Sequence, residues 1–161
     1  MKQILSMLIA GIFIAGCGGG KSDNASKTDP YDATKNTATT ESGNPSYDPE
    51  RGKGKFTKIE VGTSLDVAMA DKGEKVYGVK CSSCHKLTEE KLVGPGWKGV
   101  TTRHSAEWIM NFVTNTDEML DKDPKAKAML ELCLVRMPNQ NLGDDEARSL
   151  YEYMRKVDGI K

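Results

Sequence analysis

Two thiols and an imidazole lie within five residues in the middle of the chain, in the order Cys81-Ser82-Ser83-Cys84-His85. A CxxCH motif of this kind is typical of covalent haem attachment. The thiols add to the vinyl groups of the porphyrin as thioethers, and the histidine that follows turns its imidazole toward the iron. The motif therefore predicts one covalent haem c, with Cys81 and Cys84 as its attachment points and His85 as an axial iron ligand.

Two other chemistries use a pair of cysteines at this spacing. A zinc site needs two more ligands, which His104 and Cys133 offer, but neither belongs to a second pair at zinc-knuckle spacing. A thioredoxin-like redox pair needs βαβ patterning around the motif, whereas the flanking residues have helical periodicity. A haem-free zinc-binding interaction module and a redox pair are therefore the less favoured alternatives.

A second axial ligand has to come from elsewhere, and a methionine thioether is the usual choice for a haem that transfers electrons. Met137 is the preferred candidate among eight methionines, because it lies in an irregular stretch between two helical patterns, fifty-two residues after His85. Met129 lies on an apolar stripe with helical spacing, which predicts a place in the core. His104 directly precedes a predicted helix cap and is a less favoured ligand.

The residues around the motif resemble the class I c-type cytochromes, which carry a single haem. Gly73 and Tyr77 lie eight and four positions before the first cysteine of the motif, where that family has a small residue and an aromatic in its N-terminal helix. Leu150 and Tyr153 match the corresponding pair of its C-terminal helix. The resemblance implies that the two helices cross at these residues. A helical glycine is itself best explained by the close approach of another backbone.

The loop after the motif, Gly94 to Gly99, resembles the same family, as does Arg103 at the same offset. The resemblance implies that the Pro95 carbonyl accepts a hydrogen bond from the second ring nitrogen of His85 and so fixes its tautomer. It also implies that Arg103 pairs with a haem propionate and that Trp97 lines the haem pocket.

Four helices around the haem are predicted, so the fold class is all-α, of the class I cytochrome c type. Their starts are marked by local capping signals, namely Asp71-x-x-Glu74, Ser105, Asp123-Pro124 and the acidic run Asp144 to Glu146. The stretch from Asn115 to Asp123 is predicted as a loop. Cys133 lies on the apolar stripe of the third helix, which favours a small buried side chain.

The first residues predict a secreted and lipid-anchored protein. Residues 1–16 contain one positive charge, a short apolar run and small residues at their end, as a secretory signal peptide does. Ile14 to Cys17 resembles the bacterial lipobox, in which the cysteine is acylated. Cys17 is therefore the predicted lipidation site. The expected location is the cell envelope of a Gram-negative bacterium, with the domain in the periplasm.

Residues 17–61 are predicted as the lipidated cysteine and a disordered, flexible tether that precedes a cytochrome c domain at residues 62–161. Between Gly18 and Phe56 there is no Val, Ile, Leu or Met, so this stretch buries too little to repay the entropy of ordering. Phe56 to Val61 alternates apolar and polar residues, as a short extended segment would.

The charges exclude one class of partner and leave another question open. Lysine and arginine number 23, as do aspartate and glutamate, so no basic excess indicates nucleic acid. Residues 72–103 hold seven basic and three acidic side chains, whereas residues 104–161 hold eight and eleven. This separation either steers the haem edge toward an acidic partner or is a chance distribution over solvated helix faces, and salt dependence distinguishes the two.

Together these features predict a monomeric, membrane-anchored monohaem carrier of single electrons, not an enzyme, because His85 and Met137 fill both axial positions. Met137 also stands where the family keeps its ligand. The resemblance implies a quinol-oxidising complex and a terminal reductase or oxidase as partners. Asn139 to Leu142 is similar to a run in lipoprotein cytochromes of nitrous-oxide reductase systems. The opposing class is a haem enzyme or gas sensor with a labile Met137.

Overall fold

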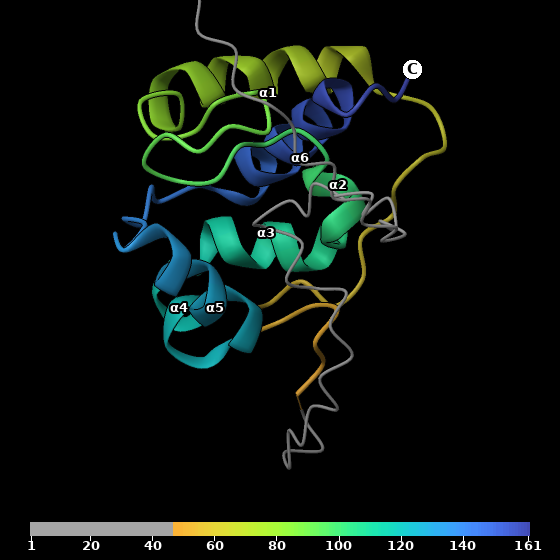
Figure 1. The fold of residues 1–161 in the computed structure, drawn as a ribbon. Coiled ribbons are helices and arrows are strands. Elements are labelled where there is room, and N and C mark those ends of the chain that lie inside the picture. The colour runs from red at the N-terminus through yellow and green to blue at the C-terminus, as the bar shows by residue number, and fades with distance from the viewer. Residues whose placement is uncertain (1–46) are drawn as a thin grey trace, which may run out of the picture.

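The structure is a computed structural model that describes residues 47–161 (Figure 1). The predicted signal peptide, Cys17 and most of the predicted tether lie outside the described residues. The described chain forms six helices: α1 (Val67–Lys80), α2 (Val100–Arg103), α3 (Ala106–Thr114), α4 (Thr116–Lys122), α5 (Pro124–Cys133) and α6 (Asp144–Val157). Within residues 47–161 an isolated bridge between His85 and Lys91 is the one piece of β-structure. The predicted all-α fold is therefore confirmed.

None of the helices in this part of the chain has the length and apolar character needed to cross a membrane.

Helices α1 and α6 cross in direct backbone contact, as predicted (Figure 1). A Cβ atom added to Gly73 would lie 2.0 Å from the Ser149 carbonyl oxygen, so only glycine fits at this crossing. The Tyr77 and Tyr153 rings lie side by side, with centroids 5.6 Å apart. The crossing fixes the C-terminal end of α1, and with it the start of the CxxCH motif.

The first helix begins five residues earlier than the capping box at Asp71 predicts. Its N-cap is Asp66, whose carboxylate accepts a hydrogen bond from the Met69 backbone nitrogen at 2.9 Å. Asp71 and Glu74 instead bind Lys156 of α6, at 3.0 and 3.2 Å. The predicted box was wrong because these two carboxylates serve as tertiary ion-pair partners at the helix crossing.

The other predicted helix starts are confirmed. Ser105 Oγ accepts a hydrogen bond from the Trp108 backbone nitrogen, and an Asp123 carboxylate oxygen accepts one from that of Ala126. At α6 the Glu146 carboxylate accepts a hydrogen bond from the Gly143 backbone nitrogen at 3.1 Å. Each cap satisfies a backbone donor that has no partner within its helix.

The stretch from Asn115 to Asp123 is largely helical, so the predicted loop was wrong. Thr116 is fully buried and donates its hydroxyl to the Phe112 carbonyl at 2.9 Å, which continues the chain from α3 into α4. Met119 and Leu120 of α4 are buried in the core. The sequence does not reveal this helix, because it has only seven residues and its two apolar ones stand among polar ones, which is too short a stretch to show helical periodicity.

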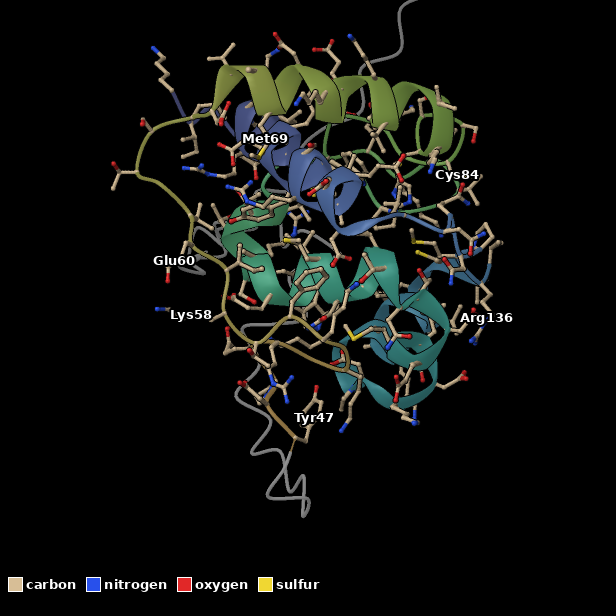
Figure 2. All side chains as sticks on the ribbon, turned by 180° about the vertical axis from the view of Figure 1, so that it is seen from behind. Tyr47, Lys58, Glu60, Met69, Cys84 and Arg136 are labelled. Atoms are coloured by element: carbon tan, nitrogen blue, oxygen red, sulfur yellow. The ribbon has the colours of Figure 1, made fainter. Side chains whose placement is uncertain are left out.

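Residues 47–61, which the sequence predicts as tether, pack on the helical domain and are called the strap here. The side chain of Asn111, fully buried on α3, donates hydrogen bonds to the Arg51 and Phe56 carbonyls and accepts one from the Phe56 nitrogen. Tyr47 donates its hydroxyl to the Asp123 carboxylate at 2.6 Å. Figure 2 shows Lys58 and Glu60 of the strap at one edge of the domain, with Cys84 and Arg136 at the other.

Candidate haem-binding site

The CxxCH motif forms one tight turn at the end of α1. The Cys81 nitrogen donates to the Tyr77 carbonyl at 2.9 Å, which closes the helix. The nitrogens of Cys84 and His85 both donate to the Cys81 carbonyl at 3.0 Å. Cys81 is buried, Cys84 is partly buried, and both are free thiols. One turn of backbone therefore carries both cysteines and the histidine.

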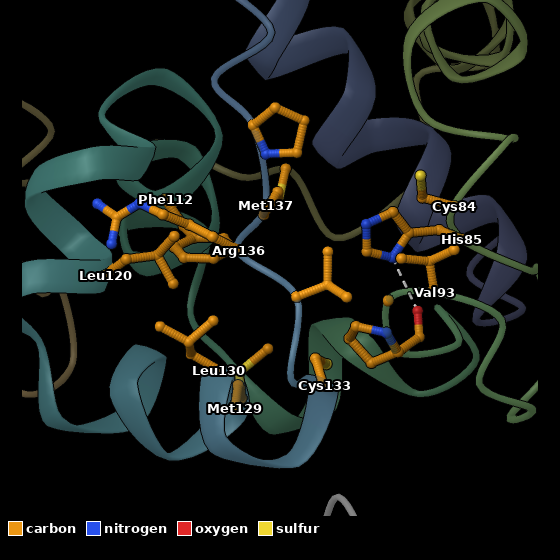
Figure 3. Close-up of a pocket in the computed structure, with 14 residues that line it drawn as sticks. Cys84, His85, Val93, Phe112, Leu120, Met129, Leu130, Cys133, Arg136 and Met137 are labelled. Atoms are coloured by element: carbon orange, nitrogen blue, oxygen red, sulfur yellow. Dashed lines mark hydrogen bonds between the residues drawn. The ribbon is translucent and has the colours of Figure 1, made fainter.

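The imidazole of His85 is oriented by the residue that the sequence predicts. Its Nδ1 atom lies 2.8 Å from the Pro95 carbonyl oxygen, so Nδ1–H donates and Nε2 is left with a free lone pair (Figure 3). Burial lowers the pKa of His85, and the Pro95 hydrogen bond opposes that effect. The ring is thus held as the neutral tautomer that a metal requires, with the ligating nitrogen selected by its partner.

Three further contacts immobilise His85. Its carbonyl accepts a hydrogen bond from the Tyr77 hydroxyl at 2.7 Å. The Trp97 ring lies beside the imidazole, with centroids 5.6 Å apart. A Cβ atom added to Gly94 would lie 2.4 Å from Cε1 and 2.9 Å from Nε2 of the ring, so the imidazole rests directly on the glycine backbone. The imidazole is therefore constrained by both Trp97 and Gly94.

Burial also sets the state of the first attachment thiol. It raises the pKa of Cys81 to about 11, although the neighbouring Lys80 ammonium acts in the opposite direction and Cys84 adds to the increase. The Cys81 side chain is therefore a neutral thiol at physiological pH in this fold. Neutral thiols are weak nucleophiles, so the folded site is not by itself an activating environment for thioether formation.

A cleft opens beside the motif turn, bounded by α3, α4, α5 and the segment that follows α5 (Figure 3). Together with its open mouth it encloses about 570 Å³, which lies within the range of about 300–1,000 Å³ for small-molecule and cofactor sites. Carbon and sulfur atoms make up almost all of its wall, with apolar side chains from several elements: Val93, Phe112, Leu120, Leu130 and Val135.

Met137 lines this cleft together with His85, so the two predicted axial ligands reach one site. Figure 3 shows both side chains on its wall, contributed by different segments of the chain. Met129 and Cys133 of α5 also line the cleft. The stripe predicts a core place for Met129 and a buried one for Cys133, but both side chains are partly buried, and of the two only Met129 packs against the core.

The donor set fits a covalently attached haem. The Cys84 thiol and the oriented imidazole of His85 line an apolar cleft, the Met137 thioether lies on its wall, and the buried Cys81 thiol stands three residues before Cys84 on the same turn. A porphyrin needs apolar walls and strong-field axial donors, and both are present. Cys81 and Cys84 would hold the haem vinyl groups, and His85 with Met137 would hold the iron.

Two predicted pocket residues, Trp97 and Arg103, are absent from the cleft lining. Arg103 donates to the carbonyls of Lys98 at 2.7 Å and Gly96 at 3.4 Å, and so braces the Gly94–Gly99 loop. Trp97 is 5% exposed and packs between Tyr77 and His85. Neither side chain lines the cleft. The propionate contact of Arg103 and the haem contact of Trp97 remain predictions.

His104 does not line the cleft. Its ring stacks on Trp108 at 4.1 Å, and its Nδ1 atom is buried with no hydrogen-bond partner. Burial lowers the pKa of His104 to about 4, and the Lys125 and Arg103 charges lower it further. In the part of the chain that the structure describes, no three His, Cys, Asp or Glu side chains gather to hold a metal ion. The arrangement favours neither bis-histidine ligation nor the zinc alternative.

The rim of the cleft is apolar. Val93 and Val135 line it and are 39% and 54% exposed, and Leu134 beside them is 85% exposed. Arg136, which also lines the cleft, pairs with acids of α4, and Lys91 donates to the Leu132 carbonyl at 2.8 Å. Sequence periodicity does not reveal this rim, because its residues lie in loops and at the end of α5.

An all-helical domain with a CxxCH turn, a carbonyl-oriented histidine and a methionine in one apolar cleft defines a class of covalent haem proteins. Comparison with known families agrees, since the family described as Cytochrome c matches residues 70–158. The chain belongs to the cytochrome c family. Members of this family bind haem c covalently and transfer electrons, and the described site has the residues to do so.

Solved structures give the same result. Cytochrome c from Rhodothermus marinus is 30% identical, with a TM-score of 0.63 over 65% of this chain and 90% of that chain. An engineered form of it, Rma TDE, is 30% identical with a TM-score of 0.65, over 69% and 98%. A further structure shows Rma TDE bound to a carbene intermediate. A search of curated proteins gave no match.

Proposed function

We propose that the protein is a membrane-anchored monohaem cytochrome c that carries one electron at a time. Its donor would be a quinol-oxidising complex, and its acceptor a terminal reductase or oxidase. The single observation that carries the proposal is the presence of Cys84, His85 and Met137 around one apolar cleft, with Cys81 on the same turn as Cys84. Similarity to the nitrous-oxide reductase-associated lipoprotein cytochromes makes that enzyme the acceptor to test first.

The bound haem would supply an iron centre that gains and loses one electron. The chain contributes rigidity, because the Pro95 carbonyl and the Gly94 backbone hold the His85 ring in one orientation in either charge state. The apolar wall excludes water and so limits the solvent reorganisation that accompanies a change of charge. Two filled axial positions leave no vacant place for substrate chemistry.

The exposed apolar rim supports electron exchange at the mouth of the cleft. A neutral rim with Val93, Leu134 and Val135 fits a partner surface that is also apolar around its own cofactor. Such docking depends on excluded water more than on charge, so electron-transfer rates should change little with ionic strength. A steep fall with added salt would favour steering by the basic half of the domain.

The anchor is proposed from the sequence, since Cys17 lies outside the described residues. A diacylglyceryl group would hold the domain stably at a membrane, because each buried methylene contributes about 0.8 kcal/mol. The domain would then work in the periplasm as a monomer. Replacing Cys17 with Ala should release the protein from washed membranes and remove the acyl mass, whereas an unchanged distribution would exclude this anchor.

The opposing candidate, a haem enzyme or gas sensor, is favoured by one observation. The segment that carries Met137 is exposed and has few contacts, which favours release of this ligand. The near-infrared band from methionine-to-iron charge transfer separates the two functions. An electron carrier shows this band in the ferric state and resists carbon monoxide and cyanide, whereas a sensor or enzyme lacks the band and binds these ligands quickly.

A further inference from the structure

The segment between α5 and α6, residues 134–141, carries Met137 and is weakly attached to the rest of the domain. Two of its residues, Leu134 and Asn141, have positive φ angles of 61° and 50°, although neither is glycine. Its side chains are exposed except for Met137 and Gln140, which are partly buried. Burial therefore contributes little to holding the segment in place.

Hydrogen bonding within the described residues gives the segment a single long-range connection. Asn141 bonds to Asn139, and Gln140 bonds to Pro138, so both of these contacts are local. The hydrogen bonds that join residues 135–141 to distant parts of the described chain all come from the Arg136 guanidinium. This residue directly precedes Met137.

The connection runs to α4, which forms part of the cleft wall. One guanidinium nitrogen of Arg136 lies 3.3 Å from an Asp117 carboxylate oxygen and 3.0 Å from one of Asp121, and 3.2 Å from the Asp117 carbonyl. Arg136 itself lines the cleft, and Figure 2 shows it on the outer edge of the domain. The three acceptors lie on one turn of helix, so they form a single site for one cation.

We infer that Arg136 is a positioning residue, which latches the Met137 segment onto α4 and thereby sets how readily Met137 leaves the sixth iron position. The inference rests on the proposed function, because it requires Met137 to be an iron ligand. The partners are more than 40% exposed on both sides, so the latch works in water and is screened by salt. Ligand release becomes sensitive to ionic strength and to any partner that competes for the guanidinium.

The test is the rate at which cyanide binds the purified ferric holoprotein at saturating cyanide, where dissociation of methionine limits the reaction. Arg136→Gln should raise this rate about three- to fivefold, the range expected for an exposed ion pair of this kind. Asp121→Asn should give a similar increase. The double variant should raise the rate by less than the product of the two single fold-increases, because both changes break the same contact.

Lys122→Gln is the matched control. Lys122 forms an exposed pair with Glu118 at 2.8 Å within α4, and it does not contact the Met137 segment. Its replacement changes the net charge equally and should leave the cyanide rate unchanged. Raising the salt concentration should accelerate the wild-type protein and have little effect on Arg136→Gln. Melting temperatures should stay close to wild type, which separates latch release from unfolding.

The outcomes are distinct. Equal cyanide rates for wild type and Arg136→Gln, with the charge-transfer band intact, would overturn the latch and leave the carrier function standing. An equal increase in Lys122→Gln would also overturn the latch, since it would show a general charge effect. Absence of the charge-transfer band in wild type would overturn both the latch and the assignment of Met137.

Discussion

His85 and Met137 line the same cleft, but the chain holds them in opposite ways. His85 is buried, rests on the Gly94 backbone and has both its ring nitrogen and its carbonyl in hydrogen bonds. Met137 lies on an exposed segment whose long-range hydrogen bonds within the described chain come from Arg136. Packing therefore holds the His85 ligand, whereas a surface ion pair holds the Met137 segment. The two ligands should be lost from the iron under different conditions.

The largest expected effect comes from removing the attachment points. Replacing Cys81 and Cys84 with Ser should abolish covalent haem and leave the domain largely unfolded, because the apolar cleft would lose the group that fills it. Near-ultraviolet circular dichroism and thermal melting measure this. A cooperative melt with a native-like signal in the double variant would show that the His85 side is stable without a haem.

Removing the ligand on the weakly held side should change the iron and spare the fold. Met137→Ala should lose the charge-transfer band, bind carbon monoxide and lower the reduction potential, because methionine ligation raises it. Met129→Ala is the control, since Met129 lines the same cleft on α5 and should keep the band. If Met129→Ala lost the band and Met137→Ala kept it, the axial assignment would be reversed.

A methyl group added at Gly94, beside the His85 ring, should lower the free energy of unfolding. Gly94→Ala would place its Cβ 2.4–2.9 Å from three atoms of the His85 ring, so the ring or the loop must move. We expect a loss of about 2–3 kcal/mol in unfolding free energy, at the upper end of overpacking effects. In Gly78→Ala the added Cβ meets nothing within 4 Å, so this control should be neutral or slightly stabilising. Equal denaturant midpoints for Gly94→Ala and wild type would show that the His85 ring is less constrained than its contacts imply.

Acid should lower the stability of the domain through His104, which is neither of the predicted axial ligands. The pKa of His104 is lowered to about 4, first by burial, so the folded state favours the neutral ring. The unfolded chain binds the proton near pH 6.5, and the stability contribution of His104 is therefore complete above that pH and is lost as the pH falls toward 4. The loss should be about 3 kcal/mol by pH 4.

Urea titrations of wild type and His104→Gln between pH 7 and pH 4 measure this difference. The variant should be flatter across that window, and the charge-transfer band of the wild type should persist while its stability falls. Identical slopes for the two proteins would assign the acid sensitivity to other groups.

The smallest effect concerns the start of the Met137 segment. Leu134 has a φ of 61° and is 85% exposed, so glycine should suit this position better and lose little burial. Leu134→Gly should stabilise the domain by about 0.5–1 kcal/mol. Val79→Gly, at an equally exposed helical site, should destabilise it by a few tenths of a kcal/mol. Destabilisation by Leu134→Gly would show that the side chain has a role at the rim.

Motif spacing predicted more of the site than periodicity did. The Cys81 to His85 motif and the Gly94 to Gly99 loop have fixed offsets, and the hydrogen bond between His85 and Pro95 is present as expected. Helix starts with a local cap, such as Ser105 and Asp123, were predictable because the capping side chain lies within three residues of its partner.

The failures share a physical cause, which is that tertiary contacts override local signals. Asp71 pairs with α6 and does not cap α1, and Thr116 to Lys122 forms a helix because Met119 and Leu120 are buried. The strap packs through the buried Asn111 side chain, fifty-five residues from Phe56, and the sequence gives no sign of this contact. Cys133 was expected as a small buried side chain, but it is only partly buried and lines the cleft.

The most direct test of the account is a pyridine haemochrome assay with intact mass, on protein made in a host with cytochrome maturation machinery. The account predicts one haem per chain, bound through two thioethers, with the mass of the acylated mature chain increased by that of a single haem. Colourless protein with unreacted Cys81 and Cys84 and the mass of the acylated chain without haem would contradict it.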